Sequence, residues 1–321
     1  MALGTAAKLI GQLEEGGEER RVKILENVNS MVDVFWPEIS LLMEKIEEWA
    51  ADSSFKGRKI ASLIASKVHY YSGSDSDALI YALQAQDIIS LEEQSDYVIA
   101  ITSKALLVYT AWRNENVEAF GELESRNLHE DLISFINKAF DCFIRSRRYY
   151  QTVGIAVDTR RNDVLKRILD DATIEKQLHF ISYCVDVVTE FAPTVTTRKD
   201  MLLAIVKRIG ASRRTYYSAL CKALKHLEDP KCLFDFLVRF ATGSERLTVM
   251  AYQLAIDIYA GAPLIFLQQV GRLINRYAQK KLNLASLLTT VDRKRAGFSL
   301  LRLESPKRIL QRSFHEVSAE R

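Results

Sequence analysis

The sequence predicts an all-α protein of stacked antiparallel helix pairs, an elongated α-solenoid or rod. Residues 55–89 read as two helices joined by a tight turn, because apolar residues recur at three- and four-residue steps in each half. The 321 residues include only five prolines and thirteen glycines, which favours long helices over sandwiches or barrels. No segment shows a convincing alternation of apolar and polar residues, the pattern of a half-buried strand.

The helix pair in residues 55–89 is the unit that the rest of the chain repeats. Its first helix carries one apolar stripe, made of Ile60, Leu63, Ile64, Val68 and Tyr71. Ala61 and Ala65 lie one turn apart beside this stripe, where a second backbone can approach closely. Residues 72–74 break the pattern, and Asp75 and Asp77 are acidic residues of the kind favoured where a helix begins. The second helix carries Ala78, Leu79, Ala82, Leu83 and Ile88. Such a pair cannot bury its own apolar face, so it needs a like neighbour on each side.

Three helices are expected before this pair. The first covers residues 2–13 and the second covers residues 20–34. Pro37 then suits the first turn of a third helix. The apolar positions of that third helix are Ile39, Leu42, Met43, Ile46 and Trp49.

A long helix and a second helix pair follow. The long helix has the stripe Tyr97, Ile101, Ala105, Val108 and Trp112. Residues 114–127 have many charges and little periodicity, so we expect a surface loop there. The second pair turns at residues 145–148, and its Gly154 and Ala156 stand roughly where Ala78 and Ala82 stand in the first pair. This internal similarity is loose.

The second half of the chain continues the helical pattern. Pro193 and the β-branched residues after it suit a connector over residues 193–197. Asp229 and Pro230 end one helix before a return helix, Ser244 suits the cap of the next, and Pro263 begins the last. The stripes of these helices include Ile181, Val185, Leu202, Ile205, Leu220, Leu224, Leu233, Phe236, Leu254, Ile258, Phe266 and Val270.

The composition is that of a folded soluble protein, with 48% apolar and 26% charged residues. No apolar run approaches the roughly 18 residues that cross a bilayer, and the first residues lack the features of a secretion signal. The widely spaced Cys142, Cys184, Cys221 and Cys232 fit buried thiols in a reducing compartment. We therefore expect the chain in the cytoplasm and nucleus.

Charge divides the chain into two parts. Residues 271–321 hold 12 Lys and Arg against 4 Asp and Glu, a net charge of +8. The first 270 residues hold the remaining 32 basic and 37 acidic residues, a net charge of −5. We predict a helical-repeat rod over residues 1–270 and a basic segment, partly helical or disordered, over residues 271–321.

No catalytic, cofactor-binding or metal-binding residue is predicted. His179 and Cys184 are five residues apart, as are Cys221 and His226, and this spacing points helical side chains away from each other. No histidine lies in a metal-binding motif; the five are His69, His129, His179, His226 and His315. The glycine-rich patterns that cradle nucleotide phosphates are absent from the sequence.

Two features near helix turns have alternative interpretations. Arg160 and Arg161 in TRRND (residues 159–163) suit either a clamp for a partner's carboxylates or a structural turn, in which they pair with Asp158, Asp163 or helix carbonyls. We favour the turn. The tyrosine pairs suit either an aromatic binding ridge or contacts that close one helix pair on the next, and we favour the contacts; they are Tyr70 and Tyr71, Tyr149 and Tyr150, and Tyr216 and Tyr217.

The basic end of the chain has two interpretations as well. Its charges suit either contact with nucleic acid or acidic protein, or a solvated end; they include Arg293, Lys294, Arg295, Lys307 and Arg308. No aromatic interleaving or nucleic-acid motif accompanies them, so nucleic-acid binding is not expected.

Five blocks, in order, resemble the N-terminal part of the proteasome non-ATPase regulatory subunit 1 family. They are VDVFWPEIS (residues 32–40) with KIE (45–47), ASKV (65–68) with YAL (81–83), YYQTVGIA (149–156) into TRRNDV (159–164), LEDP (227–230), and MAYQL (250–254) into DIY (257–259). Beyond about Val270 we find no resemblance, and no proteasome/cyclosome toroid repeat follows.

The resemblance implies a function without catalysis. It implies a scaffold in the base of the 26S regulatory particle, with other regulatory-particle subunits as partners and a role in ubiquitin-dependent degradation. It implies no cofactor, small-molecule substrate or membrane. The alternative is a TPR- or HEAT-like adaptor of another complex, and an enzyme ranks third because no constellation of residues supports one.

Overall fold

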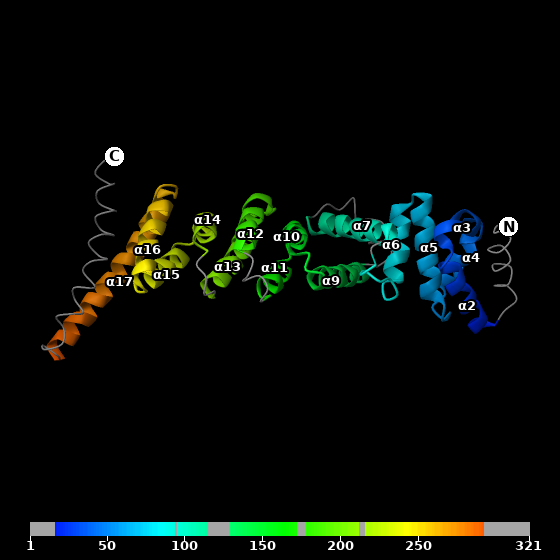
Figure 1. Ribbon diagram of the computed structural model, residues 1–321, viewed down its shortest axis with the longest axis horizontal. Helices are drawn as coiled ribbons and strands as arrows, with labels where there is room; N and C mark the ends of the chain where they lie inside the picture. The colour runs from blue at the N-terminus through cyan, green and yellow to red at the C-terminus, as the bar shows by residue number, and fades with distance from the viewer. Residues whose placement is uncertain (1–16, 94, 115–128, 172–177, 212–215, 292–321) are drawn as a thin grey trace. The chain divides into compact units, whose positions relative to one another are not determined.

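The computed structural model describes residues 17–93, 95–114, 129–171, 178–211 and 216–291, and side chains as far as Gln279. Over these ranges the chain is helical and contains no strand, which confirms the predicted all-α fold (Figure 1). The helices group into two compact units, Met1–Arg161 and Asn162–Arg321. The helix expected over residues 2–13, most of the loop expected at 114–127, and the basic residues beyond 291 lie outside the described residues.

The first unit is a succession of helices in which each packs against near neighbours in the sequence. Its elements are α2 (Glu18–Asn29), α3 (Val32–Ile39), the short 3₁₀ helix η1 (Ser40–Leu42), α4 (Met43–Ala51), α5 (Arg58–Ser72), α6 (Asp75–Gln84), α7 (Asp96–Arg113), α9 (His129–Arg145) and α10 (Tyr149–Asp158). Helix α5 is central to the early part, because α2, α3, α4 and α6 all pack on it. Helix α7 packs on α6 and α9, and α9 packs on α10. This neighbour-to-neighbour packing is the repeat architecture that the sequence predicts.

The helix pair predicted in residues 55–89 is α5 and α6. Gly73 ends α5 in the left-handed conformation, with φ of +86°. The N–H of Ser74 donates to the carbonyl of His69 at 2.9 Å, and the N–H of Gly73 donates to Tyr70 at 3.1 Å. These two bonds form a Schellman motif, and glycine adopts its left-handed position without the penalty that a Cβ brings.

The small residues of this pair are buried as predicted. Ala65 of α5 and Ala82 of α6 are both fully buried. Beside them, the buried Ser66 hydroxyl donates to the carbonyl of Ala78 at 2.6 Å. Because a hydroxyl has one proton, the Tyr97 hydroxyl, 2.7 Å away, is the donor in its bond to Ser66. One hydroxyl group thus joins α5, α6 and α7.

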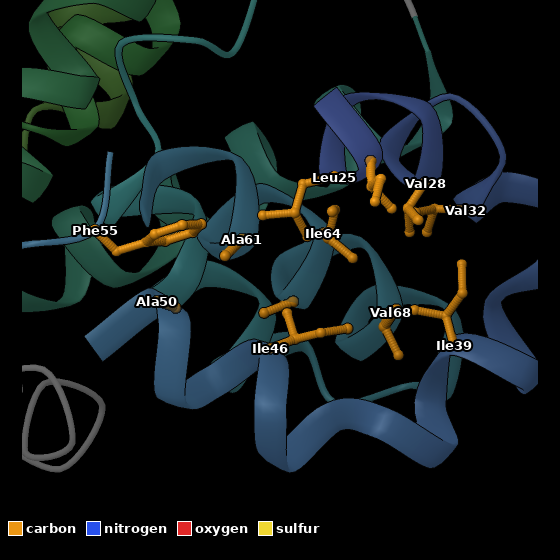
Figure 2. Packing of buried hydrophobic residues seen from close by; sticks show 12 residues of the cluster. Leu25, Val28, Val32, Ile39, Ile46, Ala50, Phe55, Ala61, Ile64 and Val68 are labelled. Carbon is orange, nitrogen blue, oxygen red and sulfur yellow. The ribbon is translucent and has the colours of Figure 1, made fainter. Parts of the chain in front are cut away.

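The early helices share one apolar core (Figure 2). Figure 2 shows side chains from α2, α3, α4 and α5 directed into the space between these helices; they include Leu25, Val28, Val32, Ile39, Ile46, Ile64 and Val68. Val32 and Ile39 are spaced seven residues apart, and so are Ile39 and Ile46, so that one side of the α3–α4 segment faces the core.

The helix expected over residues 20–34 is wrong in its extent. Helix α2 ends at Asn29 and α3 begins at Val32. Within α3 the backbone leaves the helical region at Phe35, with φ of −107° and ψ of 17°. The cause is Pro37, which has no N–H and whose ring crowds the preceding turn. Pro37 therefore lies in the first turn after a break, as predicted.

Two further expectations need correction. Ile88 does not belong to α6, which ends at Gln84, and its side chain is 43% exposed. The connector predicted at residues 193–197 is shorter than expected, because α13 already begins at Val195. The Thr194 hydroxyl accepts a hydrogen bond from the N–H of Thr197 at 3.2 Å. This side-chain cap stabilises a first turn that β-branched residues alone would disfavour.

The second unit continues the same pattern of packing. Its helices are α11 (Asn162–Leu169), α12 (Leu178–Phe191), α13 (Val195–Ala211), α14 (Tyr217–Leu227), α15 (Pro230–Ala241), α16 (Glu245–Tyr259) and α17 (Leu264–Val291). Helix α13 packs on α11, α12 and α14, and α15 packs on α16 and α17. Helix α17 passes through Gly271, where the charge changes, and the division of the chain at that residue stays a prediction.

The stop predicted at Asp229 and Pro230 is confirmed. Pro230 occupies the first turn of α15, where a missing N–H costs nothing. The Asp229 carboxylate accepts hydrogen bonds from the N–H groups of Lys231 at 3.0 Å and Cys232 at 3.3 Å. Ser244 stands at the position before α16, but its side chain makes no capping bond.

Helix ends in this chain also use left-handed residues other than glycine. Arg147, between α9 and α10, has φ of +55° and is exposed. Its N–H donates to Ile144, and the N–H of Arg148 donates to Phe143, each at 3.0 Å. The hydrogen bonds are those of a Schellman motif, but a Cβ in this conformation costs about 1–2 kcal/mol.

We expect Arg147→Gly to raise the free energy of unfolding by about 1 kcal/mol, because it removes this penalty and no buried contact. The measurement is urea denaturation followed by circular dichroism. Arg148→Gly is the matched control, since Arg148 has an ordinary φ of −81° and should lose stability instead. A loss of stability in both variants would contradict the assigned backbone strain.

Candidate interaction surfaces

Three of the four cysteines, Cys184, Cys221 and Cys232, lie in surroundings that keep their thiols protonated. Cys184 is fully buried, and burial raises its pKa. Burial also raises the pKa of Cys221, and it raises the pKa of Cys232 to about 11. The buried Cys142 donates its S–H to the carbonyl of Leu91, with 3.3 Å between Sγ and oxygen. Since the thiolate is the reactive form, these environments disfavour nucleophilic chemistry.

Slow alkylation should follow from these pKa shifts. A pKa of about 11 in place of 9 lowers the thiolate fraction of Cys232 about 100-fold at neutral pH. We expect iodoacetamide to modify Cys232 at least ten times more slowly in the folded chain than in guanidinium chloride, as followed by mass spectrometry. Cys184, which is buried as well, should react more slowly still. Rapid modification of either residue in the folded chain would contradict the protonated state.

The histidines do not supply a metal centre in the part of the chain that the structure describes. No group of three or more His, Cys, Asp and Glu side chains gathers there in a way that could hold a metal ion. His69 instead lies 3.0 Å from Glu47 and stacks on Tyr81, with 5.4 Å between ring centroids. The pKa of His226 is lowered by burial and then by its cationic neighbours, chiefly Lys222. His315 lies outside the described residues.

The TRRND turn is held by hydrogen bonds within the first unit. Arg160 adopts the left-handed conformation, and the N–H of Arg161 donates to the carbonyl of Ala156 at 2.8 Å. The Arg113 guanidinium of α7 donates to the carbonyls of Thr159 at 3.2 Å and Arg160 at 3.3 Å. An arginine from a neighbouring helix thereby satisfies carbonyls that the end of α10 leaves open.

The Arg161 guanidinium is turned toward its own unit. It donates to the Tyr109 hydroxyl at 3.2 Å and to the Asn137 side-chain carbonyl at 2.9 Å. Its carbon lies 5.4 Å from the centroid of the Phe140 ring. This geometry, with Arg161 bonded to Tyr109 and Asn137, favours the structural interpretation of the turn. The clamp for a partner is correspondingly disfavoured at this residue.

The first tyrosine pair closes contacts between helices. Tyr70 meets the Tyr97 ring edge-on, with 5.6 Å between centroids, and links α5 to α7. Tyr71 stacks on Trp36 of α3 with centroids 6.3 Å apart. Burial, followed by the nearby Asp33 carboxylate, raises the pKa of Tyr71 to about 12. These rings pack against neighbouring helices of the same unit.

One tyrosine of each remaining pair, Tyr149 and Tyr216, is buried. Tyr149 is buried, whereas Tyr150 is about half exposed. Tyr216 is buried, and the Tyr217 hydroxyl of α14 donates to the Asp257 carboxylate of α16 at 2.7 Å. The favoured interpretation, contacts that close one helix on the next, agrees with this arrangement, and no aromatic ridge forms from these six residues.

The surface residues that the sequence analysis missed are apolar side chains on the outward faces of helices. They are Val34, Leu41, Ile99, Leu107, Phe191, Val195, Val249, Ile256, Leu264 and Ile265. The sequence does indicate the exposure of some of them. Val34 and Leu41 each follow a core position, Val32 or Ile39, by two residues, and two residues turn a helix by about 200°. Among the described helices, none has both the length and the apolar character that a membrane crossing requires.

The fold and these surfaces define a helical-repeat protein, in which successive helix pairs bury one another and leave side chains outward for contact. A protein-family model described as "26S proteasome subunit RPN2, N-terminal domain" matches residues 4–301. The chain belongs to this family. The match confirms the resemblance found in the sequence, and it extends past Val270.

Individual relatives agree with the family match. The chain is similar to the 26S proteasome non-ATPase regulatory subunit 1 of Drosophila melanogaster, with 32% identity over 271 residues, 84% of this chain and 26% of that protein. It is 31% identical to the 26S proteasome regulatory subunit RPN2 of Eremothecium gossypii over 82% of the chain and 28% of the relative. With the RPN2 of Saccharomyces cerevisiae it shares 25% identity over 91% of the chain and 31% of the relative. The chain thus spans about a quarter to a third of these relatives.

Proposed function

We propose that this chain is a non-catalytic scaffold subunit of the 26S proteasome regulatory particle, within its base. The observation that carries the proposal is the family match over residues 4–301, supported by relatives whose names describe them as 26S proteasome regulatory subunits. Its partners would be other subunits of the regulatory particle. Its place would be the cytoplasm and the nucleus, and its effect would be on ubiquitin-dependent degradation.

The physical character of the described helices supports positioning over catalysis. The thiols of Cys184 and Cys232 have raised pKa values, and the Arg161 guanidinium is engaged by its own unit. Each helix pair exposes one surface to a partner. Close packing of neighbouring helices fixes the position of that surface within its unit. A fixed array of faces suits a subunit that holds other subunits in place.

The test is affinity purification of the tagged full chain from cells, with quantitative mass spectrometry and sedimentation of the captured material. We expect regulatory-particle subunits to be enriched and the chain to co-sediment with 26S particles. Capture of one unrelated complex, with no proteasome subunit enriched, would overturn the proposal and favour an adaptor of that complex. Phe140→Ala, which should destabilise the first unit, controls for non-specific capture by the tag.

The basic end of the chain should contribute little to this assembly. We expect the subunits to be retained when five basic residues of the tail are replaced by glutamine in one variant, which lowers the net charge of residues 271–321 from +8 to +3; the residues are Arg293, Lys294, Arg295, Lys307 and Arg308. Retention should weaken only mildly above physiological salt, where the screening length is about 8 Å, if packing dominates. Loss of all subunits in the neutralised variant, together with their retention by the isolated tail, would assign binding to the basic segment instead.

A further inference from the structure

An apolar stripe runs along the outward side of α3 and η1. We name Val34, Pro37 and Leu41 the outer stripe. Val34 is 72% exposed and Leu41 is 84% exposed, and Pro37 is exposed between them. Pro37 and Leu41 are four residues apart after the break at Phe35, and Val34 lies just before that break. All three are exposed, whereas Val32 and Ile39 point into the core that Figure 2 shows.

The outer stripe lies in a locally acidic segment. Residues 32–51 contain one basic residue, Lys45, and five acidic residues, a net charge of −4; the acidic residues are Asp33, Glu38, Glu44, Glu47 and Glu48. Two of these face α5, because Asp33 lies 3.9 Å from the ammonium of Lys67 and Glu47 lies 3.0 Å from the His69 ring.

The remaining three carboxylates have no such partner. Glu38, Glu44 and Glu48 make no ion pair with any residue that the structure describes. Glu44 and Glu48 are exposed, whereas one carboxylate oxygen of Glu38 is buried without a hydrogen-bond partner. We name the two exposed carboxylates, Glu44 and Glu48, the acidic rim. Glu44 and Glu48 lie on the next helix, α4, three and seven residues after Leu41 in the sequence. A partner that binds here needs an apolar surface to cover the outer stripe. It also needs positive charges next to that surface to pair with the acidic rim.

The geometry points to the outer stripe and its acidic rim as a docking site for a basic amphipathic helix of another polypeptide. Val34 and Leu41 are seven residues apart, on either side of the break at Phe35, a separation comparable to two turns of a partner helix, about 10 Å. A partner helix would present apolar side chains at positions i, i+3 or i+4, and i+7 to this length, with Lys or Arg beside them. Opposite charges across the contact would fix its register and exclude acidic helices. This inference does not depend on the proposed function.

The negative charge of the acidic rim favours a basic helix over the other molecules that could cover an exposed apolar face. A second copy docking through the same face would bring one acidic rim against another, and like charges disfavour that contact. The side chains of the chain's own residues 1–16 hold Glu14 and Glu15 against one Lys8, a net charge of −1, so they have no net positive charge to match the rim. Nucleic acid and anionic membrane surfaces are disfavoured for the same reason.

A defined peptide tests the inference on the full chain. The probe is an 18-residue synthetic helix with leucine at one face and lysine at the others, and the measurement is fluorescence anisotropy. We expect saturable binding that weakens as salt rises. The control peptides replace every lysine by glutamate, or keep the composition in scrambled order, and should bind at least tenfold more weakly. Equal binding of the glutamate peptide would overturn the inference.

Variants locate the peptide on the surface. We expect Val34→Ser with Leu41→Ser to raise the dissociation constant at least tenfold, and Glu44→Gln with Glu48→Gln to raise it about fivefold and reduce the salt dependence. The matched control is Ile99→Ser with Leu107→Ser, a pair of exposed apolar residues on α7 that should leave binding unchanged. All three variants alter exposed residues, so circular dichroism should show an unchanged melting temperature. Loss of binding in the control alone would overturn the assignment.

A photoreactive benzophenone amino acid at position 41 distinguishes the occupants in cells, with position 107 as control. Cross-links that map to a basic helical segment of another protein would support the inference. Cross-links to residues 1–16 of the same chain, or between two copies of the chain, would overturn it. Cross-links to an acidic or neutral segment would overturn it equally.

Discussion

Replacing Phe140 by alanine is expected to lower the free energy of unfolding by about 3–5 kcal/mol. Phe140 is fully buried on α9, and the guanidinium of Arg161 lies over its ring. The substitution removes the buried ring and leaves a cavity, and it also removes the surface on which the arginine rests. Loss of stability is therefore larger here than at an ordinary core methyl group.

The measurement is urea denaturation of the full chain, followed by circular dichroism and by tryptophan fluorescence, to which Trp112, in contact with His129 of α9, contributes. Tyr150→Ala is the matched control, because it removes an aromatic ring that is about half exposed on α10. We expect that control to change stability by less than about 1 kcal/mol. A similar small change for Phe140→Ala would show that α9 is not packed into the unit as the structure has it.

The second large effect is expected for Ala82→Leu, at about 1–3 kcal/mol of lost stability. Ala82 is fully buried on α6, which packs on both α5 and α7. A leucine adds three carbon atoms where the neighbouring helices leave no space, so side chains or backbones must shift. Thermal unfolding by calorimetry measures the loss.

Ser76→Leu is the control for this variant, because Ser76 is an exposed residue in the first turn of the same helix. It adds a comparable side chain without burial and should leave the melting temperature nearly unchanged. An unchanged melting temperature for Ala82→Leu as well would contradict the close packing of this helix pair.

The helix pairs were predictable because their signals are local. The apolar spacing of α5, the glycine at its end and the acidic start of α6 all lie within residues 58–77 and agree with one another. The break at Phe35 was harder to place, because Pro37 acts on the residues before it. At the early start of α13, the Thr194 hydroxyl accepts a hydrogen bond from the N–H of Thr197 and lies within hydrogen-bond distance of the Thr196 and Thr197 hydroxyls, contacts that apolar spacing does not predict.

The surroundings of the candidate site residues were less predictable, because they depend on contacts between distant residues. Arg161 binds Tyr109 and Asn137, which are 52 and 24 residues away in the sequence, and no local pattern names them. The exposure of Leu41 is a similar case, since an apolar residue at helical spacing is ordinarily assigned to a core. In the structure Leu41 is 84% exposed, while Val32 and Ile39 are buried.

The hydroxyl of Ser66 makes the motions of three helices interdependent. If α7 moved away alone, the buried Tyr97 hydroxyl would lose its acceptor inside an apolar seam, and if α6 moved alone, the Ser66 proton would lose the Ala78 carbonyl. Separate unfolding of α6 or α7 beside Ser66 therefore costs free energy, because it leaves a buried polar group without a hydrogen bond. The amide protons of α5, α6 and α7 beside Ser66 should then exchange with solvent through one shared opening event, so that this part of the array behaves as a single cooperative block.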